Sequence, residues 1–94
     1  MADITVQEQV ADEDGWIFDV HVKEGDEETR HSVSLTREYH KKLAGERGIA
    51  PAELVETSFQ FLLAHEPKES ILPSFALREI QKYFPDFEKS VFKM

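Results

Sequence analysis

Apolar and polar residues alternate along the first 35 positions of the chain, in three segments separated by two turns rich in Gly and acidic residues. A period of two is typical of β-strands with one buried face. The residues that share one, mostly apolar, face of each segment are Ile4, Val6 and Val10, then Trp16, Phe18, Val20 and Val22, then His31, Val33 and Leu35. This pattern predicts a three-stranded antiparallel β-meander over residues 1–35.

The turns predict the register of these strands. A two-residue loop at Gly25-Asp26 would place Phe18 beside Val33, with nearly every large apolar residue of the hairpin on the same face. The first loop would place Val10 beside Trp16, also on that face. One side of the sheet is therefore expected to be apolar and the other polar.

Helical periodicity begins after the third segment. Thr36 is predicted to cap a first helix, because a threonine hydroxyl accepts a hydrogen bond from a free amide of the first turn. Pro51 suits the first position of a second helix, and Pro67 should end it. A third helix is expected between Pro73 and Pro85, followed by a last short turn.

Together these elements predict an α+β fold, with a three-stranded antiparallel β-meander packed on three to four α-helices. The 94 residues are a typical size for a single domain. Residues 1–35 would form the meander and residues 36–94 the helical layer. The helix Pro51–His65 is apolar around most of its circumference, so we expect it to lie in the centre, against the apolar face of the sheet.

Charge is concentrated in the first third of the chain. Residues 1–36 contain ten acidic and two basic side chains, whereas residues 37–94 contain nine of each, and the formal net charge is −8. Nucleic-acid binding depends largely on neutralisation of phosphates by Lys and Arg. We therefore do not expect the acidic sheet to bind nucleic acid.

The composition narrows the chemistry further. The chain contains no Cys, which excludes disulfides, thiol catalysis and thiolate zinc sites. Its N-terminus lacks the basic start and apolar run of a signal peptide. The longest apolar run, at residues 61–64, is too short to cross a bilayer. We expect a cytoplasmic protein that does not associate with membranes.

No catalytic or metal-binding constellation is apparent. His21 and His31 fall on opposite faces of the predicted sheet, and no two His residues have the spacing of a helical metal site. No Gly-x-Ser-x-Gly motif and no glycine-rich phosphate loop occurs. We expect no catalytic residue, cofactor or metal ligand, and a small hydrolase or metal enzyme stays a remote alternative.

The segment Arg30-His31-Ser32-Val33-Ser34-Leu35-Thr36, followed by two predicted helices, resembles the ribbon-helix-helix family of small DNA-binding repressors and antitoxins. In that family the strand pairs with its twin in a dimer, and its outward residues read the major groove. The resemblance covers residues 30–65 and implies that Arg30, Ser32 and Ser34 contact DNA. An antitoxin-like DNA-binding regulator is therefore the alternative function.

The C-terminal segments Glu66-Pro67-Lys68-Glu69-Ser70-Ile71-Leu72 and Tyr83-Phe84-Pro85 resemble those of a set of small bacterial proteins that also share a strand-rich acidic start. No activity is assigned to that set. The resemblance implies a self-standing bacterial domain of unknown function.

Two features favour a non-enzymatic protein-interaction or regulatory module. The C-terminal region is dense in aromatic residues, which form either an exposed docking patch or part of the core. The third strand carries small polar residues on an edge expected to be free, which suggests a homodimer joined there. The candidate partner-binding residues are Arg30, Ser32, Ser34, Tyr83, Phe87 and Phe92.

Overall fold

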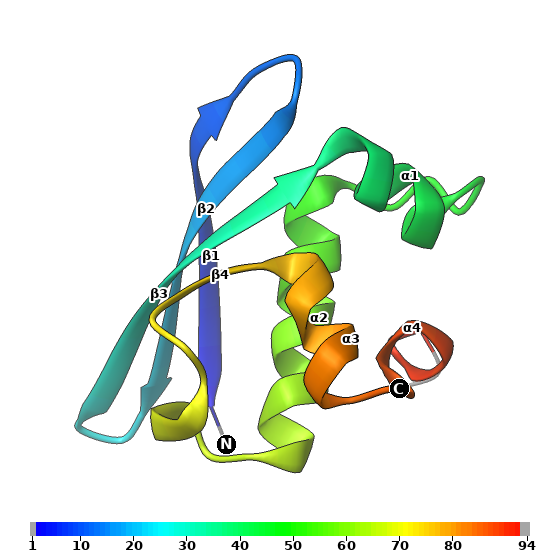
Figure 1. Cartoon of the computed structure of the whole chain (residues 1–94). Helices are drawn as coiled ribbons and strands as arrows, with labels where there is room; N and C mark the ends of the chain where they lie inside the picture. The colour runs from blue at the N-terminus through cyan, green and yellow to red at the C-terminus, as the bar shows by residue number, and fades with distance from the viewer. Residues whose placement is uncertain (1, 93–94) are drawn as a thin grey trace.

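The computed structural model describes residues 2–92 and has an α+β fold, as the sequence predicts. Figure 1 shows the helices gathered on one face of a twisted sheet. The strands are β1 (Asp3–Ala11), β2 (Gly15–Glu24), β3 (Glu27–Thr36) and β4 (Ser74–Ala76). The α-helices are α1 (Arg37–Ala44), α2 (Pro51–His65), α3 (Ile80–Tyr83) and α4 (Phe87–Ser90), and two 3₁₀ helices are η1 (Lys68–Ser70) and η2 (Leu77–Glu79).

The sheet has four strands in the order β1-β2-β3-β4. The first three form the antiparallel meander expected from residues 1–35, but β4 pairs in parallel with β3, so the prediction of a three-stranded sheet is wrong by one strand. With three residues and a single large apolar side chain, Phe75, β4 is too short for alternation to reveal it.

The predicted register of the second hairpin is confirmed. Phe18 faces Val33 and Trp16 faces Leu35. Because side chains alternate between the faces of a strand, these residues share one side of the sheet, where most of them are buried. His21 and His31 accordingly lie on opposite faces.

The register predicted for the first hairpin is wrong at the end of β1 that lies next to the loop. An irregularity between Glu8 and Val10 shifts the pairing by one residue, so Val10 faces Ile17 instead of Trp16. Such a bulge moves the following side chains to the opposite face. Val10 is 43% exposed and lies with Ile17 on the outer face of the sheet.

Gly15 begins β2 at a position that requires glycine. Its φ is +154°, and a Cβ there would lie 2.1 Å from the carbonyl oxygen of Leu35. The close approach lets β2 begin directly beside the end of β3, where Gly15 pairs with Thr36. A side chain would force the two strands apart.

Helix α1 begins at the predicted cap. The hydroxyl of Thr36 accepts a hydrogen bond from the amide of Tyr39 at 3.0 Å, and Tyr39 and Leu43 are buried on the inner face. The ring of Trp16 meets that of His40 edge-on, which attaches the helix to β2.

Helix α2 lies against the sheet, as its wide apolar face predicts. Pro51 opens it, and the chain leaves it at Glu66. Phe59 is fully buried at the centre and contacts the rings of His31 on β3 and Phe75 on β4. The core therefore lies between α2 and the inner face of the sheet.

The C-terminal region departs from the single helix expected between Pro73 and Pro85. The first three residues after Pro73 join the sheet as β4, and between there and Pro85 only η2 and α3 are helical. The last turn, α4, is present, with Phe87 and Val91 both fully buried.

The edge of the third strand is not free where the dimer was predicted. Ser32 and Ser34 of β3 pair with Ser74 and Ala76 of β4, and the amide of Ser32 donates to the carbonyl of Pro73 at 2.8 Å. The prediction of a free edge is therefore wrong at residues 32–34, because a later segment of the same chain occupies it.

Candidate functional site

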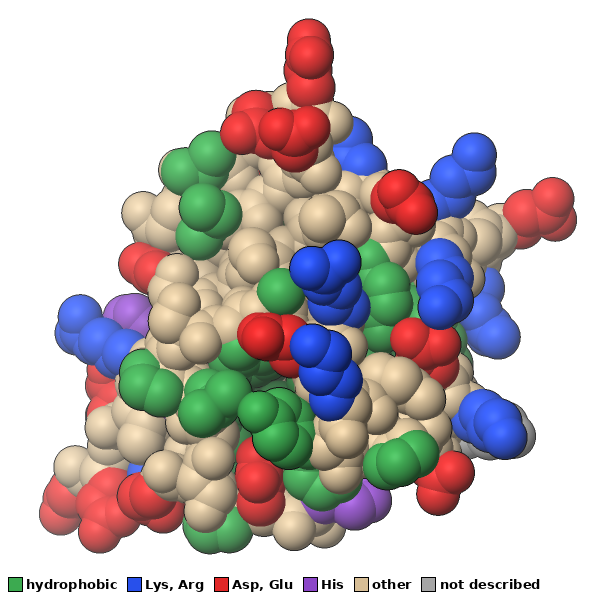
Figure 2. Space-filling view, viewed as in Figure 1, with side chains coloured by type: hydrophobic (Ala, Val, Ile, Leu, Met, Phe, Trp, Pro, Cys, Tyr) green, Lys and Arg blue, Asp and Glu red, His purple; other side chains and the backbone are tan. Residues whose placement is uncertain are grey.

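An apolar groove of about 350 Å³ opens between the C-terminal end of α2, the loop that follows it and α3. Figure 2 shows hydrophobic side chains around this hollow near the middle of the face, with acidic side chains above and below it. The lining residues are Leu62, Glu66, Ser70, Ile71, Leu72, Phe75, Glu79, Ile80, Tyr83 and Phe84.

Two large apolar side chains of the lining are strongly exposed. Leu72 is 46% exposed and Tyr83 is 68% exposed. They account for half of the exposed large hydrophobic residues in the described part of the chain, and the other two, Val10 and Ile17, lie on the outer face of the sheet. The groove thus combines a buried apolar floor with an exposed apolar rim.

One wall of the groove is the segment that carries the chain from α2 back to the sheet. Pro67 cannot continue α2, and the amide of Glu66 closes its last turn on the carbonyl of Leu62 at 2.8 Å. After η1, Ile71 turns inward and is buried, whereas Leu72 turns outward.

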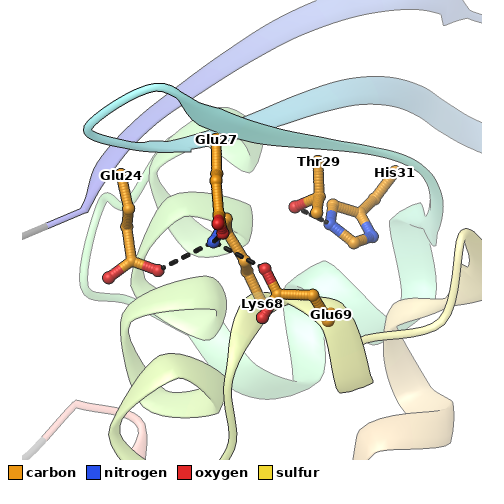
Figure 3. A network of polar contacts seen from close by, with 6 residues as sticks. All are labelled: Glu24, Glu27, Thr29, His31, Lys68 and Glu69. Atoms are coloured by element: carbon orange, nitrogen blue, oxygen red, sulfur yellow. Dashed lines mark hydrogen bonds and ion pairs between the residues drawn. The ribbon is translucent and has the colours of Figure 1, made fainter.

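The buried ammonium group of Lys68 attaches this wall to the turn between β2 and β3. Lys68 is 3% exposed, and its Nζ lies 3.3 Å from Glu24, 3.1 Å from Glu27 and 2.6 Å from Glu69. Figure 3 shows the ammonium between the hairpin turn and η1. Glu24 and Glu27 face each other across that turn, and like charges in this position repel. Lys68 relieves the repulsion and ties the wall to the hairpin.

The ion pairs shift the titration of both partners. Hydrogen bonds to the carboxylates of Glu69 and Glu27 raise the pKa of Lys68, and they outweigh its desolvation. The hydrogen bond from Lys68 lowers the pKa of Glu69. Lys68 and Glu69 are therefore both charged near neutral pH.

His31 provides a second attachment for the wall. Its Nδ1 lies 2.8 Å from the carbonyl oxygen of Leu72, and its Nε2 lies 2.9 Å from the hydroxyl of Thr29. A carbonyl oxygen only accepts, so Nδ1 donates to Leu72. This contact holds the backbone of an exposed rim residue against β3.

The opposite wall is built by η2 and α3. At the start of η2, the carboxylate of Glu79 accepts a hydrogen bond from the amide of Ala76 at 2.8 Å. Ile80 is buried, and Phe84 meets the rings of Phe61 and His65 on α2 edge-on. These contacts leave Tyr83 on the outside of the short helix, at the rim.

A second, polar hollow of about 860 Å³ lies between α1 and the η2–α3 segment. There the hydroxyl of Tyr39 donates to Glu88 at 2.8 Å, and Lys42 lies 3.3 Å from the other oxygen of the same carboxylate. Burial, followed by this hydrogen bond, raises the pKa of Tyr39. Because these groups bind one another, we regard the apolar groove as the better candidate site.

The predicted partner-binding residues do not form one site. Arg30, Ser32 and Ser34 lie on the outer face of the sheet, and Arg30 donates to Glu28. Phe87 is fully buried, so its proposed role in an exposed patch is wrong.

Of the three candidate aromatics Tyr83, Phe87 and Phe92, only Tyr83 lines the groove. Phe92 is half-buried, and the guanidinium carbon of Arg47 lies 4.7 Å from the centroid of its ring. Sequence reasoning missed Leu72, Glu66 and Glu79. The sequence signal that could have indicated Leu72 is the run Ser70-Ile71-Leu72-Pro73, in which two apolar residues stand between residues that favour turns.

Residues 2–92 show no other kind of site that the structure supports. Within them, no group of three or more His, Asp or Glu side chains is arranged to hold a metal ion. None of their helices is long and apolar enough to cross a membrane. Comparisons with protein-family models, curated proteins and solved structures gave no match.

Proposed function

We propose that this protein is a non-enzymatic protein-interaction module that binds an apolar side chain of a partner's chain segment in the groove between α2, the loop after it and α3. The observation that carries this proposal is the exposed apolar rim, Leu72 and Tyr83, around an apolar hollow. The volume of about 350 Å³ is within the usual range of binding pockets, roughly 300–1,000 Å³.

The attachment of the groove walls supports the same proposal. Lys68 and His31 hold one wall, and the packing of Phe84 on α2 holds the other. A preformed groove loses less conformational entropy when a partner binds, which favours affinity. Large apolar and aromatic anchors in such hollows commonly supply most of the binding energy of an interface.

The antitoxin-like alternative has less support. Arg30, Ser32 and Ser34 do share the outward face of β3. However, β3 lies between β2 and β4 at residues 32–34, where a twin strand would have to pair. A gel shift on duplex DNA at low salt tests this alternative, because phosphate contacts would give retention that declines as salt rises.

Selection from a displayed library of random twelve-residue peptides tests the groove. Peptides are selected on the wild-type protein and depleted on the double variant Leu72→Ser/Tyr83→Ser. We expect enriched peptides with a large apolar or aromatic residue that bind wild type at least about tenfold more tightly than the double variant, because two apolar contacts are lost. Circular dichroism checks that the variant is folded.

A matched variant, Val10→Ser/Ile17→Ser, removes the two exposed hydrophobic residues of the outer sheet face. It should bind the selected peptides as wild type does. Peptides that depend on Val10 and Ile17 instead, or a selection that yields no peptide dependent on the groove, would contradict the proposed function.

A further inference from the structure

The charges that line the groove are all of one sign. Glu66 and Glu79 contribute carboxylates, and the other lining residues, as far as the structure describes them, include no Lys, Arg or His. An apolar groove with two acidic groups has a negative potential, which favours a cationic ligand.

Neither carboxylate is neutralised by a base in the part of the chain that the structure describes. Within residues 2–92, no ion pair forms to Glu66 or Glu79. One oxygen of Glu79 accepts from the amide of Ala76, which leaves its other oxygen available to a ligand. Both side chains are half-buried, so they face the groove with restricted access to water.

The position of Glu66 adds to this potential. It is the C-terminal cap of α2, a helix of 15 residues. The free carbonyl groups at a helix C-terminus carry partial negative charge, and a carboxylate there is unfavourable unless a cation lies nearby. A basic group of a partner would satisfy the carboxylate and the helix end together.

The two bases of the η2–α3 segment face away from the groove. Arg78 and Lys82 line the polar hollow and not the groove. The two hollows therefore differ in charge, and the acidic groove is the one with the apolar rim.

We propose that the partner segment carries a Lys or Arg next to its apolar anchor, and that this base pairs with Glu66 and Glu79. The inference rests on the proposed function and names the chemistry of its partner. The anchor enters between Leu72 and Tyr83, and the ammonium or guanidinium reaches the carboxylates that line the groove.

The peptides enriched on the wild-type protein test this inference. Lys and Arg should exceed their frequency in the unselected library at positions adjacent to the anchor. In a synthetic peptide, replacing that base by Ala should weaken binding about two- to fivefold for each ion pair lost. Replacing the base by Glu should weaken binding further.

Variants of the protein provide the reciprocal test. Glu66→Gln/Glu79→Gln should weaken binding of the basic peptide and leave binding of its Ala analogue unchanged. Raising NaCl from about 0.05 M to about 0.5 M should reduce affinity for wild type more than for this variant. Glu53→Gln/Glu56→Gln, which removes two exposed acids of α2, is the matched control and should behave as wild type.

The outcomes separate the two proposals. Enriched peptides that require Leu72 and Tyr83 but contain no excess of bases would overturn this inference and leave the proposed function intact. Equal losses in the two Glu→Gln variants would also overturn it, because net charge alone would then explain the effect. A selection without groove-dependent peptides contradicts the proposed function, and the inference with it.

Discussion

The ammonium of Lys68 lies 3.1 Å from a carboxylate oxygen of Glu27, a residue 41 positions earlier in the chain. This contact joins the wall of the groove to the turn between β2 and β3. It also places a positive charge between two carboxylates that face each other across the turn. The same side chain therefore stabilises the hairpin and positions Leu72.

Lys68→Met should lower the denaturant midpoint of unfolding and loosen the groove wall. The substitution leaves three carboxylates close together without a cation. Amide exchange should accelerate at Ser70 and Ile71, whose amides donate to the carbonyls of Pro67 and Lys68. Lys23→Met, on the exposed outer face, is the control. Equal midpoints and equal exchange in the two variants would show that Lys68 does not hold the wall.

The Lys68–Glu69 pair predicts a stability change in acid. Its hydrogen bond lowers the pKa of Glu69 in the folded protein. The resulting stabilisation is fully present above the ordinary glutamate pKa of about 4.3 and is lost as the pH falls through the lower folded value. Glu69→Gln should therefore reduce the loss of unfolding free energy between about pH 6 and about pH 3.

Urea titrations across that range measure this slope. In the Lys68→Met background, Glu69→Gln should change the slope much less, because the group that lowers the pKa is gone. An unchanged slope in Glu69→Gln itself would be incompatible with the ion pair.

The sheet could be predicted from sequence wherever a regular period and a tight turn acted together. Phe18 and Val33 were placed correctly because a two-residue turn determines every later pair of the hairpin. The prediction for Val10 is wrong because the sequence gives no sign of the bulge, and an apolar residue at this position can lie on either face of the sheet. β4 was missed because it is defined by its pairing with β3 and not by a local pattern.

The candidate site was less predictable than the sheet. Tyr83 was identified by aromatic density, but Phe87, from the same cluster, is in the core. Helices of four residues are too short for periodicity to separate their faces. Glu66 and Glu79 are distant in sequence and meet at the groove only because β4 returns the chain to the sheet.

Tyr39 predicts a second pH dependence, in alkali. Burial and the hydrogen bond to Glu88 raise its pKa, so the folded protein retains the phenol proton at a pH where the unfolded chain loses it. This stabilisation is complete below the ordinary value of about 10 and declines as the pH rises above it. Tyr39→Phe should show a smaller decline.

At neutral pH, Tyr39→Phe should also cost about 1.5–3 kcal/mol of unfolding free energy, because the lost hydrogen bond has a charged acceptor. Thermal unfolding at several pH values measures both effects. Parallel stability curves for wild type and variant above about pH 10 would contradict a buried, hydrogen-bonded phenol.

Gly15 and Gly25 allow a comparison of two glycines with positive φ. Gly25→Ala meets no atom within 4 Å and should cost about 1–2 kcal/mol, the cost of left-handed backbone. Gly15→Ala should cost clearly more, because its Cβ would overlap the carbonyl oxygen of Leu35. Denaturant unfolding of the two variants gives the order. A Gly15 variant as stable as the Gly25 variant would mean that β2 does not begin so close to β3.

The most direct measurement of the central claim is intermolecular nuclear Overhauser contact between a selected peptide and the isotope-labelled protein. We predict contacts from the peptide's apolar anchor to the methyl groups of Ile71, Leu72 and Ile80, which line the groove. Contacts to Val10 and Ile17, on the outer face of the sheet, in place of these would contradict the account.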